Sequence, residues 1–249
     1  MQDEQRIKPA NIENIVATNQ GKRPLTMDPP VAKPLSVTAV AKLRTEDHII
    51  VDTRSSGEFG AGHIPNAYNI QLSSDEFEQR IGWVTPHDVP IILVTGKDGE
   101  AQTAVHKMAF VALDSRVVGY LKGGLPAWMN AGGSVATVAQ IDVKTLHHRL
   151  SVNGIQVLDV RDSEEWEEGH VENGVHMNFK VMSDQIQNLP LTTEQSIAIT
   201  CATGKRSSTA ASILLRHGYK KLYNVTGGMV AWEAAKLPML DGEGNVCKI

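Results

Sequence analysis

Cysteine is scarce in this chain, whose 249 residues contain only Cys201 and Cys247. Two distant cysteines can build neither the disulfide framework of a small secreted domain nor a zinc site of clustered thiolates. Aromatic residues make up 5% of the chain, and no run approaches the roughly 20 apolar residues of a transmembrane helix. Positive charge is not in excess, since the formal net charge is -4. Nucleic acid and membranes are therefore not expected partners.

The N-terminal stretch MQDEQRIKPANIEN is polar and lacks the apolar segment of a secretory signal. Together with the scarcity of cysteine, this predicts a cytoplasmic protein. Hydrophobic residues make up 41% and charged residues 21%, a balance typical of globular proteins. The length is sufficient for two domains of ordinary size.

The chain contains an internal repeat. VDTRSSGEFGAGHIPNAYNI (51–70) aligns without gaps with LDVRDSEEWEEGHVENGVHM (158–177), and GGLPAW (123–128) recurs as GGMVAW (227–232). Two blocks that recur in the same order indicate two copies of one domain. We predict an extended, proline-rich N-terminal tail over residues 1–34, a first copy over 35–135 and a second over 136–249.

Each copy alternates apolar runs of strand length with segments of helical spacing. In the second copy IQVLDV, SIAIT and KLYNV predict strands, and VKTLHHRL, SSTAASILLRHG and GGMVAWEAA predict helices. Ser207 or Ser208 is the expected N-cap of the middle helix, which should end at Gly218. The first copy repeats this order, so the fold class is α/β, with two domains that are each a mainly parallel sheet with helices on both faces.

Cys201 directly follows the run SIAIT, at the end of a predicted strand, where parallel sheets collect their ligands. A thiol is nucleophilic only as the thiolate, and an unperturbed pKa of about 8.5 leaves little of that form at pH 7. Convergent backbone N–H groups around Gly204, the following helix N-terminus, and the charges of Lys205 and Arg206 all favour an anion. We therefore predict a nucleophilic Cys201 whose loop holds an attached anionic group: a persulfide, or alternatively a sulfonate or phosphate.

A buried cysteine that acts only as a small hydrophobe is the competing interpretation. The sequence Gly-Lys-Arg between a buried strand and a helix favours a functional thiol instead. Cys247 lies in the polar tail GEGNVCKI and is interpreted as incidental.

The two copies resemble rhodanese domains, and the chain resembles a tandem-domain sulfurtransferase over about residues 36–240. The resemblance is carried by the D-x-R…E…G-H-[IV]…N block, by C-x-x-G-x-R-S at 201–207, and by the G-G…A-W block of each copy. It implies a ping-pong reaction in which Cys201 takes sulfane sulfur from thiosulfate or a low-molecular-weight persulfide and passes it to cyanide or a thiol. No metal and no cofactor are implied.

The resemblance also implies roles for the residues that follow the cysteine. The backbone from Ala202 to Ser207 would cradle the terminal sulfur, and Lys205 and Arg206 would attract the anionic donor. The cradle consists of Ala202, Thr203, Gly204, Lys205, Arg206 and Ser207.

The first copy departs from this pattern. Aligning VTGKDGEAQ (94–102) with ITCATGKRS (199–207) places Gly96 opposite Cys201 and Glu100-Ala101 opposite the Lys-Arg pair. The first copy should therefore be catalytically inactive. We expect it to cover the active cleft, to shape substrate access or to hold a partner.

Several repeated residues are expected to support the fold. Asp159, Arg161, Glu165 and His170 recur in the inactive copy as Asp52, Arg54, Glu58 and His63, which predicts an ion pair or hydrogen-bond network that ties a strand end to the next loop. The run Glu164–Glu168 is interpreted as a solvated helix face, and Trp128 and Trp232 as core anchors. The adjacent His147 and His148 point apart on a helix, so no shared metal is expected.

The spacing within the cysteine loop also distinguishes between rival functions. Cysteine phosphatases of related fold have five residues between Cys and Arg, whereas Ala202–Lys205 supplies four, a ring better suited to one sulfur atom. A phosphate-binding P-loop is excluded because Ile199 and Arg206 stand where it needs glycine and Ser or Thr. Enzymes specific for mercaptopyruvate usually carry C-G-S-G-[VT]-[TS] instead of C-A-T-G-K-R, which weighs against that donor.

A sulfur-carrier or redox-sensing binding module remains the alternative function. The proline-rich tail resembles the connector to a persulfide dioxygenase, whose H-x-H-x-D-H motif does not occur in this chain. Such a dioxygenase, fused or separate, or a protein sulfur acceptor, is accordingly an expected partner.

Overall fold

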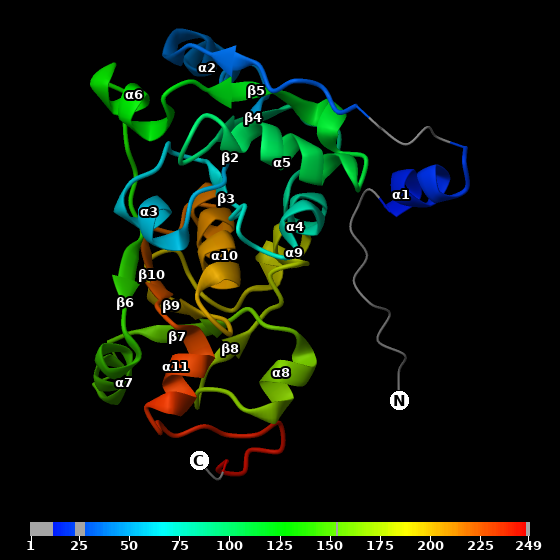
Figure 1. The fold of residues 1–249 in the computed structure, drawn as a ribbon. Coiled ribbons are helices and arrows are strands. Elements are labelled where there is room, and N and C mark those ends of the chain that lie inside the picture. The colour runs from blue at the N-terminus through cyan, green and yellow to red at the C-terminus, as the bar shows by residue number, and fades with distance from the viewer. Residues whose placement is uncertain (1–11, 23–27, 153, 248–249) are drawn as a thin grey trace. The chain divides into compact units, whose positions relative to one another are not determined.

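The computed structural model describes residues 12–22, 28–152 and 154–247, which form two compact units (Figure 1). One unit comprises the described chain up to Arg54 together with Ala67–Val135. The other comprises Ser55–Asn66 and the described chain from Ala136 onward. Each unit contains one five-stranded sheet with parallel strand pairing, so the predicted α/β fold class is confirmed.

The first sheet has the strand order β1-β5-β4-β2-β3. Its central strands pair in register, with Val94 opposite Asp52 at their carboxyl ends. The strands are β1 (Pro34–Leu35), β2 (Ile49–Asp52), β3 (Tyr68–Asn69), β4 (Ile91–Val94) and β5 (Val117–Leu121).

The second sheet repeats the topology with the order β6-β10-β9-β7-β8. Thr200 lies opposite Asp159 at the carboxyl ends of the two central strands, so Cys201 leaves the sheet at the edge where parallel sheets bind ligands. The strands are β6 (Ala139–Ile141), β7 (Gln156–Asp159), β8 (Val175–His176), β9 (Ser196–Thr200) and β10 (Lys221–Val225).

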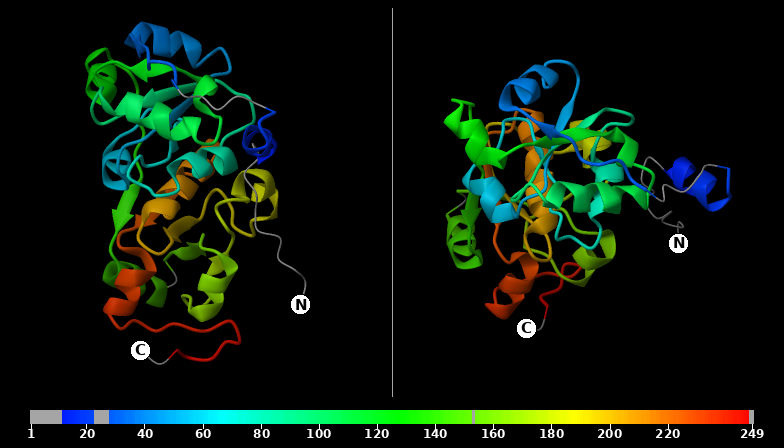
Figure 2. Two further views of the ribbon diagram at one scale, coloured as in Figure 1. Left: turned by 45° about the vertical axis from the view of Figure 1, so that its right-hand side comes forward. Right: turned by 45° about the horizontal axis from the view of Figure 1, so that its top comes forward.

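Helices cover both faces of the second sheet: α10 packs on one face, and α7 and α11 lie together on the other (Figures 1 and 2). None of the described helices is long and apolar enough to cross a membrane. The first copy contributes α2 (Val37–Leu43), α3 (Ser56–Ala61), α4 (Phe77–Val84), α5 (Glu100–Ala109) and α6 (Gly124–Asn130). The second contributes α7 (Val143–Ser151), α8 (Ser163–Glu168), α9 (Met182–Gln185), α10 (Lys205–Arg216) and α11 (Gly228–Ala234). Short 3₁₀ helices span Asp114–Arg116 and Ile186–Asn188.

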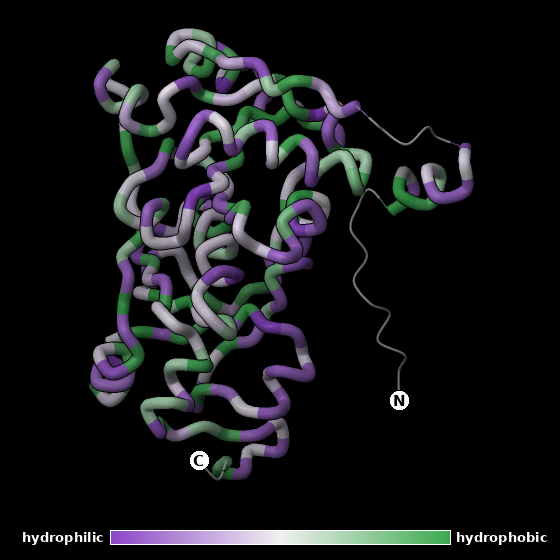
Figure 3. The backbone as a smooth tube through the Cα atoms, viewed as in Figure 1, coloured by the Kyte–Doolittle hydropathy of each residue, from purple (hydrophilic) through white to green (hydrophobic). Residues whose placement is uncertain are grey.

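The strand β9 is buried on both faces, as the apolar run predicts. Ile197, Ala198 and Ile199 have no exposed surface, which fixes the strand in the interior of its unit. Figure 3 shows the hydrophobic segments of the backbone in green. Trp128 and Trp232 are 4% and 1% exposed, so the prediction that they are core anchors is confirmed.

The start of α10 differs from the prediction. The helix begins at Lys205 with Gly204 as its N-cap, rather than at a cap on Ser207 or Ser208. Gly204 has φ +94°, a left-handed conformation that glycine adopts at low cost, and this lets the chain turn from strand to helix earlier. Ser207 and Ser208 consequently lie buried in the first turn of the helix.

The N-terminal tail is not extended throughout. A helix, α1, spans Ile12–Asn19, where Ile12, Ile15 and Val16 have the spacing of one helix face. The strand β1 begins at Pro34, at the end of the predicted tail, and pairs with β5. Pro24 lies outside the described residues.

Candidate active site around Cys201

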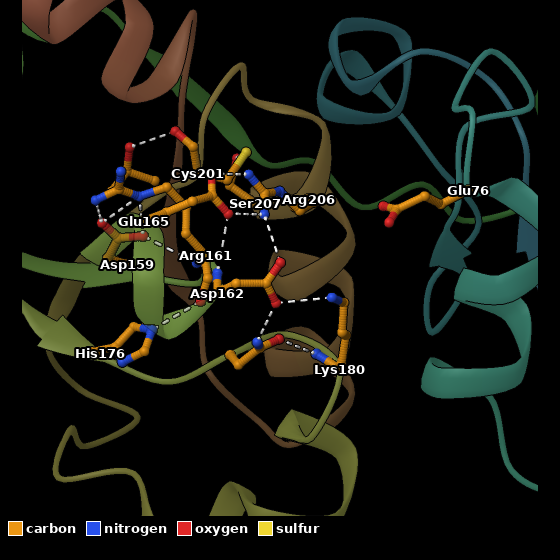
Figure 4. A network of polar contacts seen from close by, with 12 residues as sticks. Glu76, Asp159, Arg161, Asp162, Glu165, His176, Lys180, Cys201, Arg206 and Ser207 are labelled. Atoms are coloured by element: carbon orange, nitrogen blue, oxygen red, sulfur yellow. Dashed lines mark hydrogen bonds and ion pairs between the residues drawn. The ribbon is translucent and has the colours of Figure 1, made fainter. Parts of the chain in front are cut away.

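Cys201 is 1% exposed and stands directly after β9, at the start of the loop that leads into α10 (Figure 4). Its Sγ accepts a hydrogen bond from the backbone N–H of Gly204 at 3.1 Å. A Cβ at position 204 would lie 3.1 Å from the Val225 carbonyl oxygen, so both the left-handed backbone and the space favour glycine. The chain therefore curls back on the sulfur, and a hydrogen bond from an amide favours the anionic form of a thiol.

The N-terminus of α11 holds the other side of this loop. The N–H of Met229 donates to the carbonyl of Cys201 at 2.8 Å, and the N–H of Val230 donates to the carbonyl of Ala202 at 3.1 Å. In a trans peptide the carbonyl and the following N–H point in opposite directions. The N–H groups of Ala202 and Thr203 therefore point away from α11.

Gly228 explains why the G-G block recurs in the sequence. Its φ is +53°, and a Cβ there would lie 2.1 Å from the carbonyl oxygen of Cys201 and 2.6 Å from that of Ala202. In the first copy Gly124 has φ +57°, and a Cβ would approach the Thr95 carbonyl to 3.0 Å. The block thus permits close backbone approach beneath each loop.

Arg206 is held by carboxylates of the segment around α8. Its Nη1 and Nη2 lie 2.5 and 2.7 Å from the Glu165 carboxylate oxygens, and Nη1 lies 3.7 Å from Asp162. The interpretation of Glu164–Glu168 as a solvated face is therefore wrong for Glu165, because its carboxylate binds a side chain of the cysteine loop. Asp162 also binds Lys180, with Nζ to Oδ1 at 2.8 Å.

The charge of Arg206 is thus largely matched within the protein. Burial alone would lower the pKa of Arg206, but the hydrogen bonds that it donates to Glu165, together with the nearby Cys201 sulfur and Asp162, raise that pKa. Arg206 therefore stays protonated, with its side chain only 14% exposed. Lys205 is exposed at the start of α10. The role of these two cations toward an anionic donor stays a prediction.

The predicted ion pair at the strand end is present in both copies. Arg161 donates to both carboxylate oxygens of Asp159 and, at 2.7 Å, to the carbonyl of Gly169, so it ties the end of β7 to the loop after α8. Asp52 and Arg54 form the equivalent pair in the first copy. That these residues support the fold rather than act on substrate stays a prediction.

The two equivalent histidines are packing residues. His170 stacks on Trp166 with ring centroids 3.7 Å apart, and His63 stacks on Phe59 at the same distance. Each Nδ1 is bonded to the carbonyl of the aromatic residue. Across the described part of the chain, no group of three or more His, Cys, Asp or Glu side chains is placed to hold a metal.

A chain of polar side chains that the sequence alone does not predict lies behind the thiol, buried at Ser207 and Asn224 and exposed at Gln140. The Ser207 Oγ lies 3.4 Å from Cys201 Sγ and 2.6 Å from Asn224 Oδ1, and Asn224 Nδ2 lies 2.9 Å from Gln140 Oε1. Ser207 is fully buried, and Asn224 is 1% exposed. A comparison of the two copies could have pointed to Asn224, since the first copy, which lacks the cysteine, has Tyr120 at that position.

The corresponding loop of the first copy contains an internal anion. The Glu100 carboxylate accepts the backbone N–H groups of Gly96 and Lys97 at 3.1 and 3.2 Å. The N-cap Gly99 has φ -64° rather than the left-handed value of Gly204. The first loop therefore lacks a thiol, and its own carboxylate, that of Glu100, already accepts the N–H groups of Gly96 and Lys97.

Cys247 differs from Cys201 in its surroundings as well as in its position in the sequence. It is partly exposed, and its Sγ lies 3.7 Å from the carbonyl oxygen of Glu168. Nothing in its surroundings supports a role as a nucleophile.

Comparison with known proteins identifies the family of both copies and several relatives of the chain. The family model of the rhodanese-like domain matches residues 36–131 and 142–235. The chain is 27% identical to a sulfurtransferase of Allochromatium vinosum over 108 residues, 43% of this chain and 99% of the relative. It is also 27% identical to the thiosulfate sulfurtransferase GlpE of Vibrio cholerae over 99 residues, 40% of this chain and 92% of the relative. The crystal structure of a thiosulfate sulfurtransferase from Pseudomonas aeruginosa aligns with 88% of this chain and 45% of its own, at 20% identity and a TM-score of 0.39.

Proposed function

The chain belongs to the rhodanese-like family, and on that premise we propose that it is a sulfurtransferase that carries sulfane sulfur on Cys201. The observation that carries the proposal is the position of Sγ at the end of β9, where it accepts the Gly204 N–H at 3.1 Å. Around it, the carbonyls of Cys201 and Ala202 are turned toward α11, which leaves the loop amides for an anion. A persulfide anion attached to Cys201 meets these amides without a metal.

The proposed reaction has two steps. The Cys201 thiolate attacks the outer sulfur of thiosulfate; a Cys–S–S⁻ bond forms, the donor S–S bond breaks, and sulfite leaves with the bonding pair. A thiophilic acceptor then attacks the terminal sulfur: cyanide leaves as thiocyanate, or a thiolate as a new persulfide, and the Cys201 thiolate is regenerated. Low-molecular-weight persulfides are donors of the same type, with a thiolate as the leaving group.

Intact-mass measurement tests this proposal. After treatment with thiosulfate or glutathione persulfide, the protein should gain one sulfur atom, and cyanide should remove it as thiocyanate. Cys201→Ser should abolish the gain, whereas Cys247→Ser, the matched control, should retain it. Sulfur gained by Cys201→Ser would overturn the assignment.

Repeated turnover separates the sulfurtransferase from the alternative carrier or redox sensor. A sulfurtransferase should release many equivalents of thiocyanate per protein, and a carrier or sensor only one. A comparison of thiosulfate, 3-mercaptopyruvate and glutathione persulfide as donors identifies the substrate. Hydrolysis of an aryl phosphate would instead indicate a phosphatase.

A further inference from the structure

The polar chain behind Cys201 determines which atom of Ser207 faces the thiol. A backbone carbonyl only accepts, so the Gln140 atom 3.2 Å from the Val138 carbonyl is the amide nitrogen, and Oε1 faces Asn224. Asn224 must then donate through Nδ2 and turn Oδ1 toward Ser207. The Ser207 Oγ lies 2.6 Å from that oxygen and donates its one hydroxyl hydrogen to it. Only a lone pair of Ser207 remains for Cys201.

We propose that Gln140 and Asn224 are positioning residues that hold Ser207 as a hydrogen-bond acceptor toward the Cys201 thiol. In the resting protein the S–H donates to Ser207 Oγ across 3.4 Å, while Sγ accepts the Gly204 N–H. The two contacts oppose each other: the amide favours the thiolate, and the hydroxyl lone pair favours the thiol. The inference rests on the proposed function for its significance, since it concerns the same nucleophile.

The first copy supports the link between this chain and the thiol. The strand pair β5–β1 places Tyr120 opposite Pro34, just as β10–β6 places Asn224 opposite Gln140. Neither Tyr120 nor Pro34 can form the amide pair of the second copy. The position equivalent to Ser207 is Gln102, whose Oε1 instead accepts the N–H of Ala32 at 2.9 Å. The polar chain is thus present in the copy that has the cysteine and replaced throughout in the copy that lacks it.

The contact with Ser207 affects the reactivity of Cys201 when no donor is bound in the loop. A protonated thiol reacts slowly with oxidants and alkylating agents. By holding Ser207 as an acceptor, the chain favours the less reactive, protonated form of Cys201 while the loop is empty. The charged groups around the loop are Lys205, Arg206, Glu165 and Asp162, and none of them is altered in the test.

The test is the pH dependence of iodoacetamide alkylation, measured without any sulfur donor in a Cys247→Ser background. Ser207→Ala removes the acceptor of the S–H group and should move the midpoint of the profile down by about half a pH unit, the effect of one weak neutral hydrogen bond. Gln140→Ala frees the Asn224 amide to turn, so that Ser207 can donate to the sulfur. The midpoint should move in the same direction.

Gln140 is exposed, so this second variant keeps the test valid if Ser207→Ala does not fold. The matched control is Gln187→Ala: Gln187 is also exposed and donates to a nearby backbone carbonyl, that of Asp184, at 3.1 Å. Its midpoint should equal that of the parent. An upward shift in Ser207→Ala would mean that the hydroxyl donates to the thiolate, and an upward shift or no shift in Gln140→Ala would likewise overturn the inference. Persulfide formation is scored separately, so its absence would count against the proposed function alone.

Discussion

Glu165 and Arg206 form a two-pronged ion pair between the first turns of α8 and α10, with oxygen–nitrogen distances of 2.5 and 2.7 Å. The same carboxylate accepts the backbone N–H of Asp162 at 3.2 Å, as the distal member of the capping box of α8. One side chain thus caps one helix and anchors the first turn of the other. In the first copy Glu58 caps α3 in the same way, but Ala101 replaces the arginine.

Glu165→Gln should destabilise the protein in a pH-dependent manner. Burial alone would raise the pKa of Glu165, but the hydrogen bond and charge of Arg206 lower it below that of an ordinary glutamate. A lowered pKa contributes stability above the unfolded-state pKa, and that contribution is lost as the pH falls through the folded-state pKa. The free energy of unfolding should therefore drop by about 1 kcal/mol at pH 7, a value discounted for partial exposure.

Urea unfolding at pH 7 and at a series of lower pH values measures this difference. It should shrink as the pH falls through the lowered folded-state pKa of Glu165, because the carboxyl group is then protonated in both the folded and the unfolded protein. Glu164→Gln, an exposed neighbour on the same helix, is the control and should show little change at any of these pH values. A difference between wild type and Glu165→Gln that stayed constant with pH would show that the ion pair is not its origin.

Gly228→Ala should reduce sulfur transfer at least tenfold by displacing the cysteine loop. The new Cβ would lie 2.1 Å from the Cys201 carbonyl oxygen, so α11 must move away and release the hydrogen bonds from Met229 and Val230. Gly218→Ala is the matched control, because Gly218 also has a positive φ, +87°, but a Cβ there meets nothing within 4 Å. Both variants bear the left-handed backbone penalty of about 1 kcal/mol.

Thiocyanate production and urea unfolding together separate the two effects. Gly218→Ala should lose stability and keep the turnover of its folded fraction, whereas Gly228→Ala should lose turnover by at least tenfold even where it is folded. Equal turnover in the two variants would show that close approach of α11 is not needed for the loop geometry.

The central strands and the nucleophile candidate could be predicted because their signals are local. Ile197–Ile199 form an uninterrupted apolar run, and Cys201 follows it directly. Strands such as β3 and β8 have two residues each and no periodicity, so they form only because β2 and β7 offer them a paired edge. Local pattern cannot reveal such strands.

The partners of the site were harder to predict because they are far apart in sequence. Glu165 and Arg206 are 41 residues apart, and Asn224 and Gln140 are 84 apart. The acidic run containing Glu165 has the composition of a solvated helix, and only the fold reveals that one of its carboxylates meets a cation. The early start of α10 was hidden for a different reason: serine is the commoner N-cap, but a left-handed Gly204 takes that place here.

Gly96→Cys should not create a second active site. In the first copy the Glu100 carboxylate already accepts the loop N–H groups and would lie 3.2 Å from a Cβ at position 96. A thiolate there would face a negative charge, and the N–H groups of Gly96 and Lys97 already donate to that carboxylate. In a Cys201→Ser background the variant should therefore gain no sulfur from thiosulfate.

Gly96→Cys combined with Glu100→Gln tests whether the Glu100 carboxylate causes the expected low reactivity of a cysteine at position 96. Removing the charge should raise the rate of iodoacetamide alkylation at pH 7 by about tenfold over Gly96→Cys alone, which corresponds to about one pH unit in the thiol–thiolate equilibrium. Sulfur transfer by the single variant at a rate close to that of Cys201 would show that the first loop remained competent despite its carboxylate.

Asp159→Asn and Asp52→Asn should destabilise the protein to a similar extent, because each aspartate neutralises a buried arginine at a strand end. Asp159 and Asp52 have no exposed surface, and Arg161 and Arg54 are their ion-pair partners. Removal of one partner of a buried pair leaves an uncompensated charge and typically costs about 3–5 kcal/mol. The exposed Asp184→Asn serves as the control in urea unfolding. If Asp159→Asn left stability intact but lost turnover, Asp159 would act on the substrate; a similar loss of stability in both copies, only one of which holds the nucleophile, would establish the structural role.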